Sequence, residues 1–270
     1  MTPAEKPKPA ANGGAQPAAD WALEPTIGTE RRWPAEISKG VREVWGDDKP
    51  YDLGPLDFVT WDDLRRVVGE LHASSAATII DLGCGTGGVG LWVASQTEGR
   101  LIGVDLSEPP LAEARRRAAR DFPQVDADFR QADMADTGLP DGSADAIMTI
   151  DAVQMATDRQ RVFSEAAWLL RPGGRLVAAT FDHPNWRPEE IPPGRQLVPD
   201  SRPLLEQAGL EVLSYQPLTA WPGRAVAVYE LMLEHRALLA GWADAALAEA
   251  EWGAAHAHMS RHVFIVAERA

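Results

Sequence analysis

The chain has 270 residues, 45% of them hydrophobic and 24% charged, which is typical of a folded protein with one sizeable α/β domain and an accessory region. Its formal net charge of −14 argues against a nucleic-acid partner, because phosphate binding depends on clustered Lys and Arg. A single cysteine, Cys84, excludes an internal disulfide, and no Cys/His spacing indicates a metal site.

The hydropathy of the sequence predicts where in the cell the protein is located. No apolar run has the length that a membrane span needs, and the N-terminus lacks the apolar core of a signal peptide. We therefore expect a cytoplasmic protein with no membrane partner.

Two N-terminal stretches precede the main domain. Residues 1–20 are rich in Pro, Ala and Gly and are predicted to be a disordered tail, because they cannot bury enough apolar surface. Residues 21–74 are predicted to form an N-terminal helical cap. One helix is expected after Pro34 and another after an N-cap at Thr60, with an Asp-, Pro- and Gly-rich loop around Tyr51 between them.

From residue 75 the pattern changes to short apolar strands that alternate with amphipathic segments. This alternation is typical of a parallel sheet with helices on both faces, which binds ligands at the carboxyl ends of its strands. We predict a Rossmann-like, doubly wound α/β domain over residues 75–270, with a mostly parallel seven-stranded sheet. Its first five strands are expected at residues 77–81, 100–105, 127–131, 144–150 and 175–180.

The region after the fifth strand departs from simple alternation. Residues 182–200 contain several prolines and are predicted to be a loop over the active site. One long helix is expected at residues 224–251, and a closing strand at 262–267. This C-terminal helix region is either a lid or a homodimer contact, and the sequence does not choose between them.

The most informative segment is residues 79–88 (I-I-D-L-G-C-G-T-G-G), where Asp81 at a strand end is followed by Gly83, Gly85 and Gly87. Glycines at alternate positions let the backbone turn sharply and approach a ligand. A nicotinamide dinucleotide fingerprint is spaced G-x-G-x-x-G, and the carboxylate of Asp81 would repel a pyrophosphate. A plain tight turn is the simpler alternative, but the strand before and the helix after favour a site for a cationic cofactor.

This segment resembles the first motif of class I S-adenosylmethionine-dependent methyltransferases, an acid followed by G-x-G-x-G. Further motifs follow in order: residues 103–107 (G-V-D-L-S) resemble the second, 131–134 (Q-A-D-M) the third, and 169–176 (L-L-R-P-G-G-R-L) the turn before the fifth strand. The resemblance is strongest to small-molecule methyltransferases of bacterial secondary metabolism and quinone biosynthesis. It implies S-adenosyl-L-methionine as the cofactor.

The resemblance also implies a role for each cofactor residue. Asp105 would accept hydrogen bonds from both ribose hydroxyls, and it lies about twenty residues after the glycine turn, as a ribose acid must. Asp133 would lie near the adenine amino group with Met134 against the ring, and Asp151 would hold the methionine part through its backbone. The predicted cofactor-binding residues are Asp81, Gly83, Cys84, Gly85, Gly87, Asp105, Leu106, Asp133, Met134 and Asp151.

The sequence indicates the catalytic residues less clearly than the cofactor-binding residues. An oxygen or carbon acceptor benefits from a base, and many relatives have D-A-x-x-H-x-P-D-R after the fourth strand, where this chain has Met155 in place of the histidine. His183, just past the fifth strand, is the remaining candidate base, although a solvent-facing loop histidine is an equally good interpretation. The other histidines, His262 among them, are expected to be structural or exposed. Predicted substrate contacts are Tyr51, Gln154, Met155 and Trp186.

We therefore predict an enzyme that transfers a methyl group from S-adenosylmethionine to oxygen, carbon or nitrogen of a small natural-product acceptor. The alternative is a cyclase or pericyclic catalyst that keeps the fold and cofactor without transferring methyl, which the missing histidine leaves open. A regulatory binding protein is disfavoured by the intact motifs. Residues 151–154 do not match the [DNS]-P-P-[YFW] motif of nucleic-acid methyltransferases.

Overall fold

The computed structural model describes residues 34–53, 59–186, 197–239 and 244–270. The predicted disordered tail, residues 1–20, and residues 187–196 of the predicted loop at 182–200 lie outside this described part. Within it, no helix is both long enough and apolar enough to cross a membrane.

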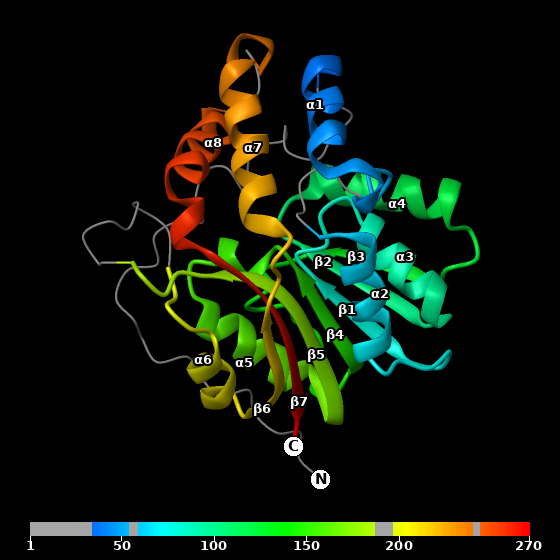
Figure 1. Cartoon of the computed structure of the whole chain (residues 1–270). Coiled ribbons are helices and arrows are strands. Elements are labelled where there is room, and N and C mark those ends of the chain that lie inside the picture. Colours follow the sequence, from blue (N-terminus) through cyan, green and yellow to red (C-terminus); the bar gives the residue numbers. More distant parts are fainter. Residues whose placement is uncertain (1–33, 54–58, 187–196, 240–243) are drawn as a thin grey trace.

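A single seven-stranded sheet organises the protein, in the order β3-β2-β1-β4-β5-β7-β6 (Figure 1). Strands β1 to β5 pair in parallel, while β7 runs antiparallel to its neighbours β5 and β6. The prediction of a Rossmann-like, mostly parallel seven-stranded sheet is confirmed. The strands are β1 (Thr78–Leu82), β2 (Arg100–Asp105), β3 (Ala127–Gln131), β4 (Ala144–Ile150), β5 (Leu170–Asp182), β6 (Leu210–Pro217) and β7 (Arg261–Arg269).

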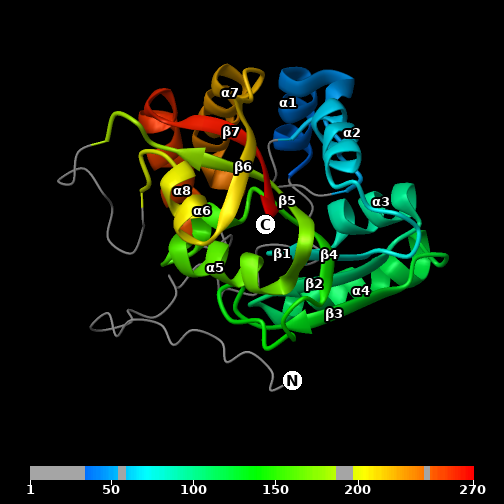
Figure 2. The ribbon, with the colours of Figure 1, turned by 90° about the horizontal axis from the view of Figure 1, so that it is seen from below.

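Helices cover both faces of the sheet because successive strand residues point to opposite faces and both sets are apolar. Ile79 packs with α2 and α3, whereas its neighbour Ile80 packs with α5 and α6. Figure 2 shows these two pairs of helices on opposite sides of the strands. The helices are α1 (Ala35–Trp45), α2 (Trp61–Glu70), α3 (Gly88–Thr97), α4 (Glu108–Asp121), α5 (Arg159–Leu169), α6 (Arg202–Gln207), α7 (Trp221–Glu234) and α8 (Asp244–His256).

Helices α1, α7 and α8 gather above the edge at which the parallel strands end (Figure 1). A third hydrophobic cluster joins them, with Ile37 of α1, Val228 and Met232 of α7 and Ala250 of α8 buried together. The prediction of one long helix over residues 224–251 is wrong. Helix α7 ends at Glu234 and α8 begins at Asp244, because two antiparallel helices can bury apolar faces against each other where one straight helix cannot.

The fifth strand is longer than the expected 175–180. It begins at Leu170, directly after α5, where Leu170 pairs with Ala144 before the register shifts and Arg175 pairs with Ala146. The R-P-G-G segment is therefore an irregularity inside β5, with Gly173 at a φ of +76°, rather than a turn before it. A glycine satisfies this backbone conformation at no steric cost.

A buried polar network closes the upper end of β5. Asp182 is fully buried, and its carboxylate accepts hydrogen bonds from the Ser201 hydroxyl at 2.7 Å and from the Tyr215 hydroxyl. Arg261 lies 3.4 Å from the same carboxylate, and Arg159, also fully buried, donates to the Phe181 carbonyl at 2.8 Å. Burial raises the pKa of Asp182 and lowers that of Arg159 to about 10. The network anchors residues 197–201 to the ligand edge of the sheet.

Candidate active site

The strand order places the glycine turn where ligands bind in open α/β sheets. From β1 the chain passes to β2 and β3 on one side, and later to β4 and β5 on the other, so the crossover crevice lies between β1 and β4. Gly83, Gly85 and Gly87 follow β1, Asp105 ends β2 and Asp151 follows β4. The structure therefore brings these predicted cofactor residues to one edge of the sheet.

The glycine turn forms a cradle that side chains would fill. Gly83, Gly85 and Gly87 have φ angles of +79°, +52° and +73°, which L-residues rarely adopt. The amides of Gly83 and Cys84 donate to the Val104 carbonyl at 2.8 and 3.0 Å, so the turn is tied to β2. A Cβ at Gly83 would lie 2.4 Å from the Cβ of Ala152, beside β4. Position 83 requires glycine because no side chain fits between the turn and Ala152 beside β4.

Asp105 has a fixed carboxylate next to this cradle. Its Oδ2 accepts from the Gly85 amide at 2.9 Å, and its Oδ1 accepts from the Ser107 amide at 2.9 Å. Each carboxylate oxygen can accept more than one hydrogen bond. Asp105 is thus oriented by the backbone and retains capacity for two neighbouring hydroxyl donors, such as those of a ribose.

Asp81 supplies a buried acid below the turn. Its side chain is almost fully buried, and this burial, together with the charge of Asp105, raises its pKa to about 7. Helix α3 packs directly on it, since a Cβ at Gly90 would lie 2.6 Å from Asp81 Oδ2. A cation nearby would offset the cost of ionising Asp81. The carboxylates of Asp81 and Asp105 together therefore suit a positively charged ligand that also carries a ribose.

Two further predicted contacts lie beside β3. The Met134 side chain reaches the turn, with its Cε 3.6 Å from the position a Cβ of Gly83 would take. Asp133 is exposed, and its Oδ1 accepts from the Ala135 amide at 2.8 Å. Both residues directly follow β3, and Met134 lies near the glycine turn.

Cys84 and Leu106 make mainly structural contacts. The Cys84 thiol is free, burial raises its pKa, and its Sγ lies 2.9 Å from the position of a Cβ at Gly103. The Leu106 carbonyl accepts from the Gln131 side chain at 3.0 Å. The interpretation of Cys84 as a packing residue inside the turn accords with this crowding.

The segment around Tyr51 covers the start of α3. Arg117 donates to the carbonyls of Asp52 and Leu53 at 2.6 and 2.9 Å. A Cβ at Gly88 would lie only 1.6 Å from the Leu53 carbonyl oxygen. The Tyr51 hydroxyl donates to the Gly46 carbonyl at 2.8 Å, and its ring packs with the hydrophobic cluster of α1, α7 and α8.

Asp151 and His262 form a buried pair that the sequence did not predict. Asp151 has a φ of +51°, and its Oδ1 lies 2.7 Å from His262 Nε2. The two side chains are 5% and 1% exposed, and the His262 ring stacks on Phe181 at 4.4 Å between centroids. The available signal was topological: β7 is antiparallel, so its first residues must lie at the edge where the parallel strands end.

His183 and Trp186 lie in an aromatic cluster against α8. His183 is 4% exposed, so the interpretation as a solvent-facing histidine is wrong. Its ring lies 5.8 Å from that of Trp186 and 6.2 Å from that of Trp252, and Trp186 stacks on Trp252 at 5.4 Å. The reason is that the chain folds back here, with the His183 amide donating to the Val198 carbonyl at 2.8 Å.

Gln154 and Met155 follow β4 in a short 3₁₀ helix, Val153–Met155. The Gln154 Oε1 accepts from the Thr180 hydroxyl at 3.1 Å, and Met155 is partly exposed. Both lie at the ligand edge, on the side of the crevice away from β1.

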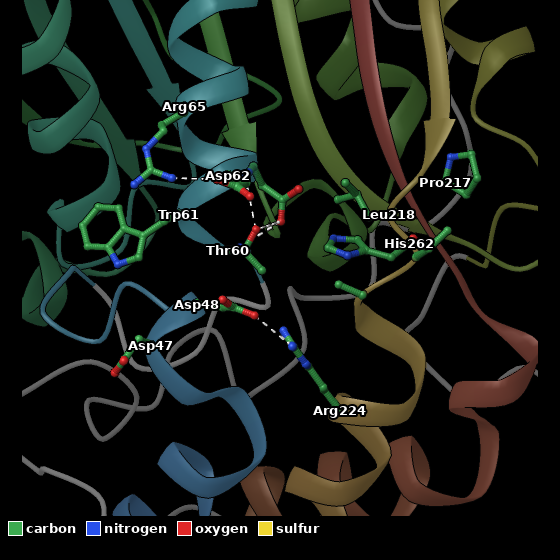
Figure 3. Close-up of a pocket in the computed structure, with 13 residues that line it drawn as sticks. Asp47, Asp48, Thr60, Trp61, Asp62, Arg65, Pro217, Leu218, Arg224 and His262 are labelled. Atoms are coloured by element: carbon green, nitrogen blue, oxygen red, sulfur yellow. Dashed lines mark hydrogen bonds and ion pairs between the residues drawn. The ribbon is translucent and has the colours of Figure 1, made fainter.

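A cavity of about 470 Å³ lies next to the Asp151–His262 pair (Figure 3). It is formed by the start of α2, the turn after α1, the β6–α7 connection and the start of β7. Its lining carries four acids and two arginines among apolar groups, and Asp48 pairs with Arg224 at 2.9 Å. The lining residues are Asp47, Asp48, Thr60, Trp61, Asp62, Asp63, Arg65, Pro217, Leu218, Thr219, Ala220, Arg224 and His262. Among the residues that the structure describes, no group of three or more His, Cys, Asp or Glu is placed to hold a metal ion.

Comparison with protein families identifies the core of the chain. Residues 79–174, from the strand before the glycine turn to the irregularity in β5, match the family model of a methyltransferase domain. This segment, about a third of the chain, is therefore similar to a methyltransferase domain. The matched segment includes the glycine turn, Asp105, Asp133 and Asp151.

Curated proteins that resemble this chain have named activities. The chain is 27% identical over 160 residues to 27-O-demethylrifamycin SV methyltransferase of Amycolatopsis mediterranei, covering 55% of this chain and 59% of the relative. It is 31% identical over 165 residues to the O-methyltransferase cnsE of Penicillium expansum, and this match covers 57% of this chain and 60% of cnsE. The chain therefore spans about 60% of the length of these two relatives.

Solved structures share the fold across most of the chain. The [4+2]-cyclase SpnF superposes with a TM-score of 0.68 at 18% identity, covering 92% of this chain and 98% of that one. Geranyl diphosphate C-methyltransferase of Streptomyces coelicolor superposes with a TM-score of 0.61 at 21% identity, and the superposition covers 91% of this chain and 90% of that one. At these identities the similarity establishes the fold.

Proposed function

We propose that this protein transfers a methyl group from S-adenosylmethionine to a small-molecule acceptor. The observation that carries the proposal is the glycine cradle at the β1–β4 crossover with the Asp105 carboxylate fixed beside it by Gly85. A turn of this shape with an oriented acid fits a ligand that carries a ribose. The methyltransferase domain matched over residues 79–174 supports this ligand as the cofactor.

The residues of the crevice fit S-adenosylmethionine, which supplies an electrophilic methyl group when it is bound. Asp105 holds the two ribose hydroxyls, and Asp133 and Met134 border the adenine. Asp81 faces the cationic methionine part, and the backbone at Asp151 closes that end. The protein's share of catalysis is to align the acceptor with the methyl group and to exclude water.

The acceptor is proposed to be a small natural product. Two relatives of the domain are named for O-methylation, one of them acting on 27-O-demethylrifamycin SV. The cavity of about 470 Å³ beside His262 falls within the range of small-molecule sites, and Trp61 and Leu218 give it apolar surface. The chain's net charge of −14 supports a partner other than nucleic acid.

The test is transfer of label. The protein is incubated with methyl-labelled S-adenosylmethionine and a panel of phenolic, polyketide-like and amine metabolites, and S-adenosylhomocysteine release is measured in parallel. Label in a product, lost in Asp105→Ala, is the expected result. Acceptor conversion without label, or no cofactor binding, would contradict the proposal.

A second candidate is a cyclase that retains the cofactor. It is favoured by Met155, which stands where many relatives of this type carry a histidine, and by the shared fold with a [4+2]-cyclase. The same incubation separates the two, because a cyclisation changes the acceptor's retention but not its mass. A mass gain of one methyl group excludes this candidate for that acceptor.

A further inference from the structure

The chain between α1 and α2 crosses the start of α3. Residues 49–53, which we call the strap, follow the short 3₁₀ helix Gly46–Asp48 after α1. They form a tight turn in which the Leu53 amide donates to the Pro50 carbonyl at 2.9 Å. The Leu53 side chain is 6% exposed and belongs to the hydrophobic cluster that contains Ile79 of β1. The strap is therefore packed against the core of the protein.

The strap meets the proposed cofactor crevice at the first residue of α3. A Cβ at Gly88 would lie 1.6 Å from the Leu53 carbonyl oxygen and 2.5 Å from Arg117 Nη1. Gly88 directly follows the glycine cradle in the sequence. Asp81, proposed to face the methionine part of the cofactor, packs on the same helix at Gly90. The first turn of α3 is therefore contacted both by a buried acid of the site and by the strap.

Arg117 of α4 holds the strap in this position. Its Nη1 donates to the carbonyls of Asp52 and Leu53 at 2.6 and 2.9 Å. The guanidinium is half-buried, and this burial lowers the pKa of Arg117, although an arginine stays protonated. The two charge-assisted hydrogen bonds offset the cost of removing the cation from water. Arg116, the next residue, is exposed and pairs instead with Glu113 at 2.9 Å.

We propose that Arg117 is a positioning residue for the cofactor, which keeps one end of the crevice covered by holding the strap on Gly88 and thereby slows cofactor exchange. The inference rests on the proposed function, in which this crevice binds S-adenosylmethionine. Arg117 acts through the backbone of Asp52 and Leu53 and touches no reacting atom. Because the product S-adenosylhomocysteine occupies the same crevice, Arg117 also sets the rate of product release.

Loss of the anchor should speed both binding and release of the cofactor. A cover that is closed most of the time blocks the ligand in both directions, so a weaker anchor raises the association and dissociation rates together. Removing a residue that only supports the shape of the site would speed release without speeding binding. The two rate constants therefore distinguish a cover from a general structural support.

The test measures both rate constants for S-adenosylhomocysteine by surface plasmon resonance on the immobilised full chain. In Arg117→Met the dissociation rate should rise by about 10-fold or more, the factor expected for loss of one charge-assisted hydrogen bond, with a smaller rise in the association rate. Arg117→Lys should lie between, because both carbonyl bonds come from one nitrogen and an ammonium group also donates from one nitrogen. Arg116→Met, which removes an exposed arginine of the same helix, is the matched control and should keep wild-type rates.

A second variant displaces the strap while Arg117 is retained. Gly88→Ala puts a Cβ against the Leu53 carbonyl and should raise both rates in the same way, so it also serves if Arg117→Met does not fold. Wild-type rates in these variants would overturn the inference and leave the proposed function intact. Faster dissociation with unchanged or slower association would overturn it as well. Absence of S-adenosylhomocysteine binding to the wild-type protein would contradict the proposed function and, with it, this inference.

Discussion

Replacing Asp81 with asparagine removes a buried carboxylate whose ionisation destabilises the folded protein. The pKa of Asp81 is raised from 3.8 to about 7, first by burial and then by the charge of Asp105. The folded state therefore binds more protons than the unfolded state between these two values. Stability contributed by the neutral carboxyl is full below pH 3.8 and is lost as the pH rises to about 7.

The magnitude follows from the same values. Raising the pKa from 3.8 to about 7 corresponds to about 4 kcal/mol of lost stability above pH 7. At pH 5.5 the loss is only about 2 kcal/mol, because the folded carboxyl is still almost fully protonated and the loss reflects only how far the pH lies above the unfolded pKa of 3.8. Asp81→Asn, which is neutral at every pH, should therefore gain stability over the wild type, and the gain should roughly double between pH 5.5 and pH 8.5.

The assay is urea unfolding of both proteins without cofactor at a series of pH values. A cationic ligand should also lower the pKa of Asp81, so cofactor binding to the wild type at pH 6 should release a proton, which calorimetry detects as a dependence on buffer ionisation enthalpy. The Asp81→Asn variant should release fewer protons on cofactor binding and should bind the cofactor more weakly than the wild type. If Asp81→Asn is less stable than the wild type by the same amount at every pH, the reasoning is refuted.

Two further substitutions test the surroundings of the site. Gly88→Ala puts a Cβ 1.6 Å from the Leu53 carbonyl oxygen and should cost about 1–3 kcal/mol in urea unfolding and weaken cofactor binding, whereas Gly69→Ala, at an open helical position, should gain about 0.5–1 kcal/mol. Ser201→Ala removes a 2.7 Å hydrogen bond to Asp182 and should cost about 1–3 kcal/mol by the same measurement. That cost should be larger at pH 8 than at pH 5, because the Ser201 bond lowers the pKa of Asp182. A flat pH response in Ser201→Ala would contradict this assignment.

Elements with a local cause could be predicted from the sequence. The predicted N-cap at Thr60 is confirmed. The Thr60 side chain accepts a hydrogen bond from the Asp63 amide, and the Asp63 carboxylate accepts one from the Thr60 amide. Strands β2, β3 and β4 have the expected bounds because apolar runs between turn residues are local signals. The glycine turn was also foreseen, since only glycine suits its φ angles.

Features that depend on long-range packing could not be predicted. The break between α7 and α8 follows from their mutual burial, and a lone glycine, Gly241, is the one helix-breaking residue type in the sequence between Glu234 and Asp244. The burial of His183 depends on Trp252, about seventy residues away. The Asp151–His262 pair joins β4 to β7 across the sheet, and only the strand order reveals it.

The most direct measurement is a calorimetric titration of the wild-type protein with S-adenosylmethionine and S-adenosylhomocysteine, since it needs no acceptor. We expect one saturable site per chain for each ligand, with affinity reduced by about 10- to 100-fold in Asp105→Ala through loss of its bonds to the ribose hydroxyls. Absence of binding, or equal affinity in Asp105→Ala, would contradict the assignment of the glycine turn and Asp105 as the cofactor site.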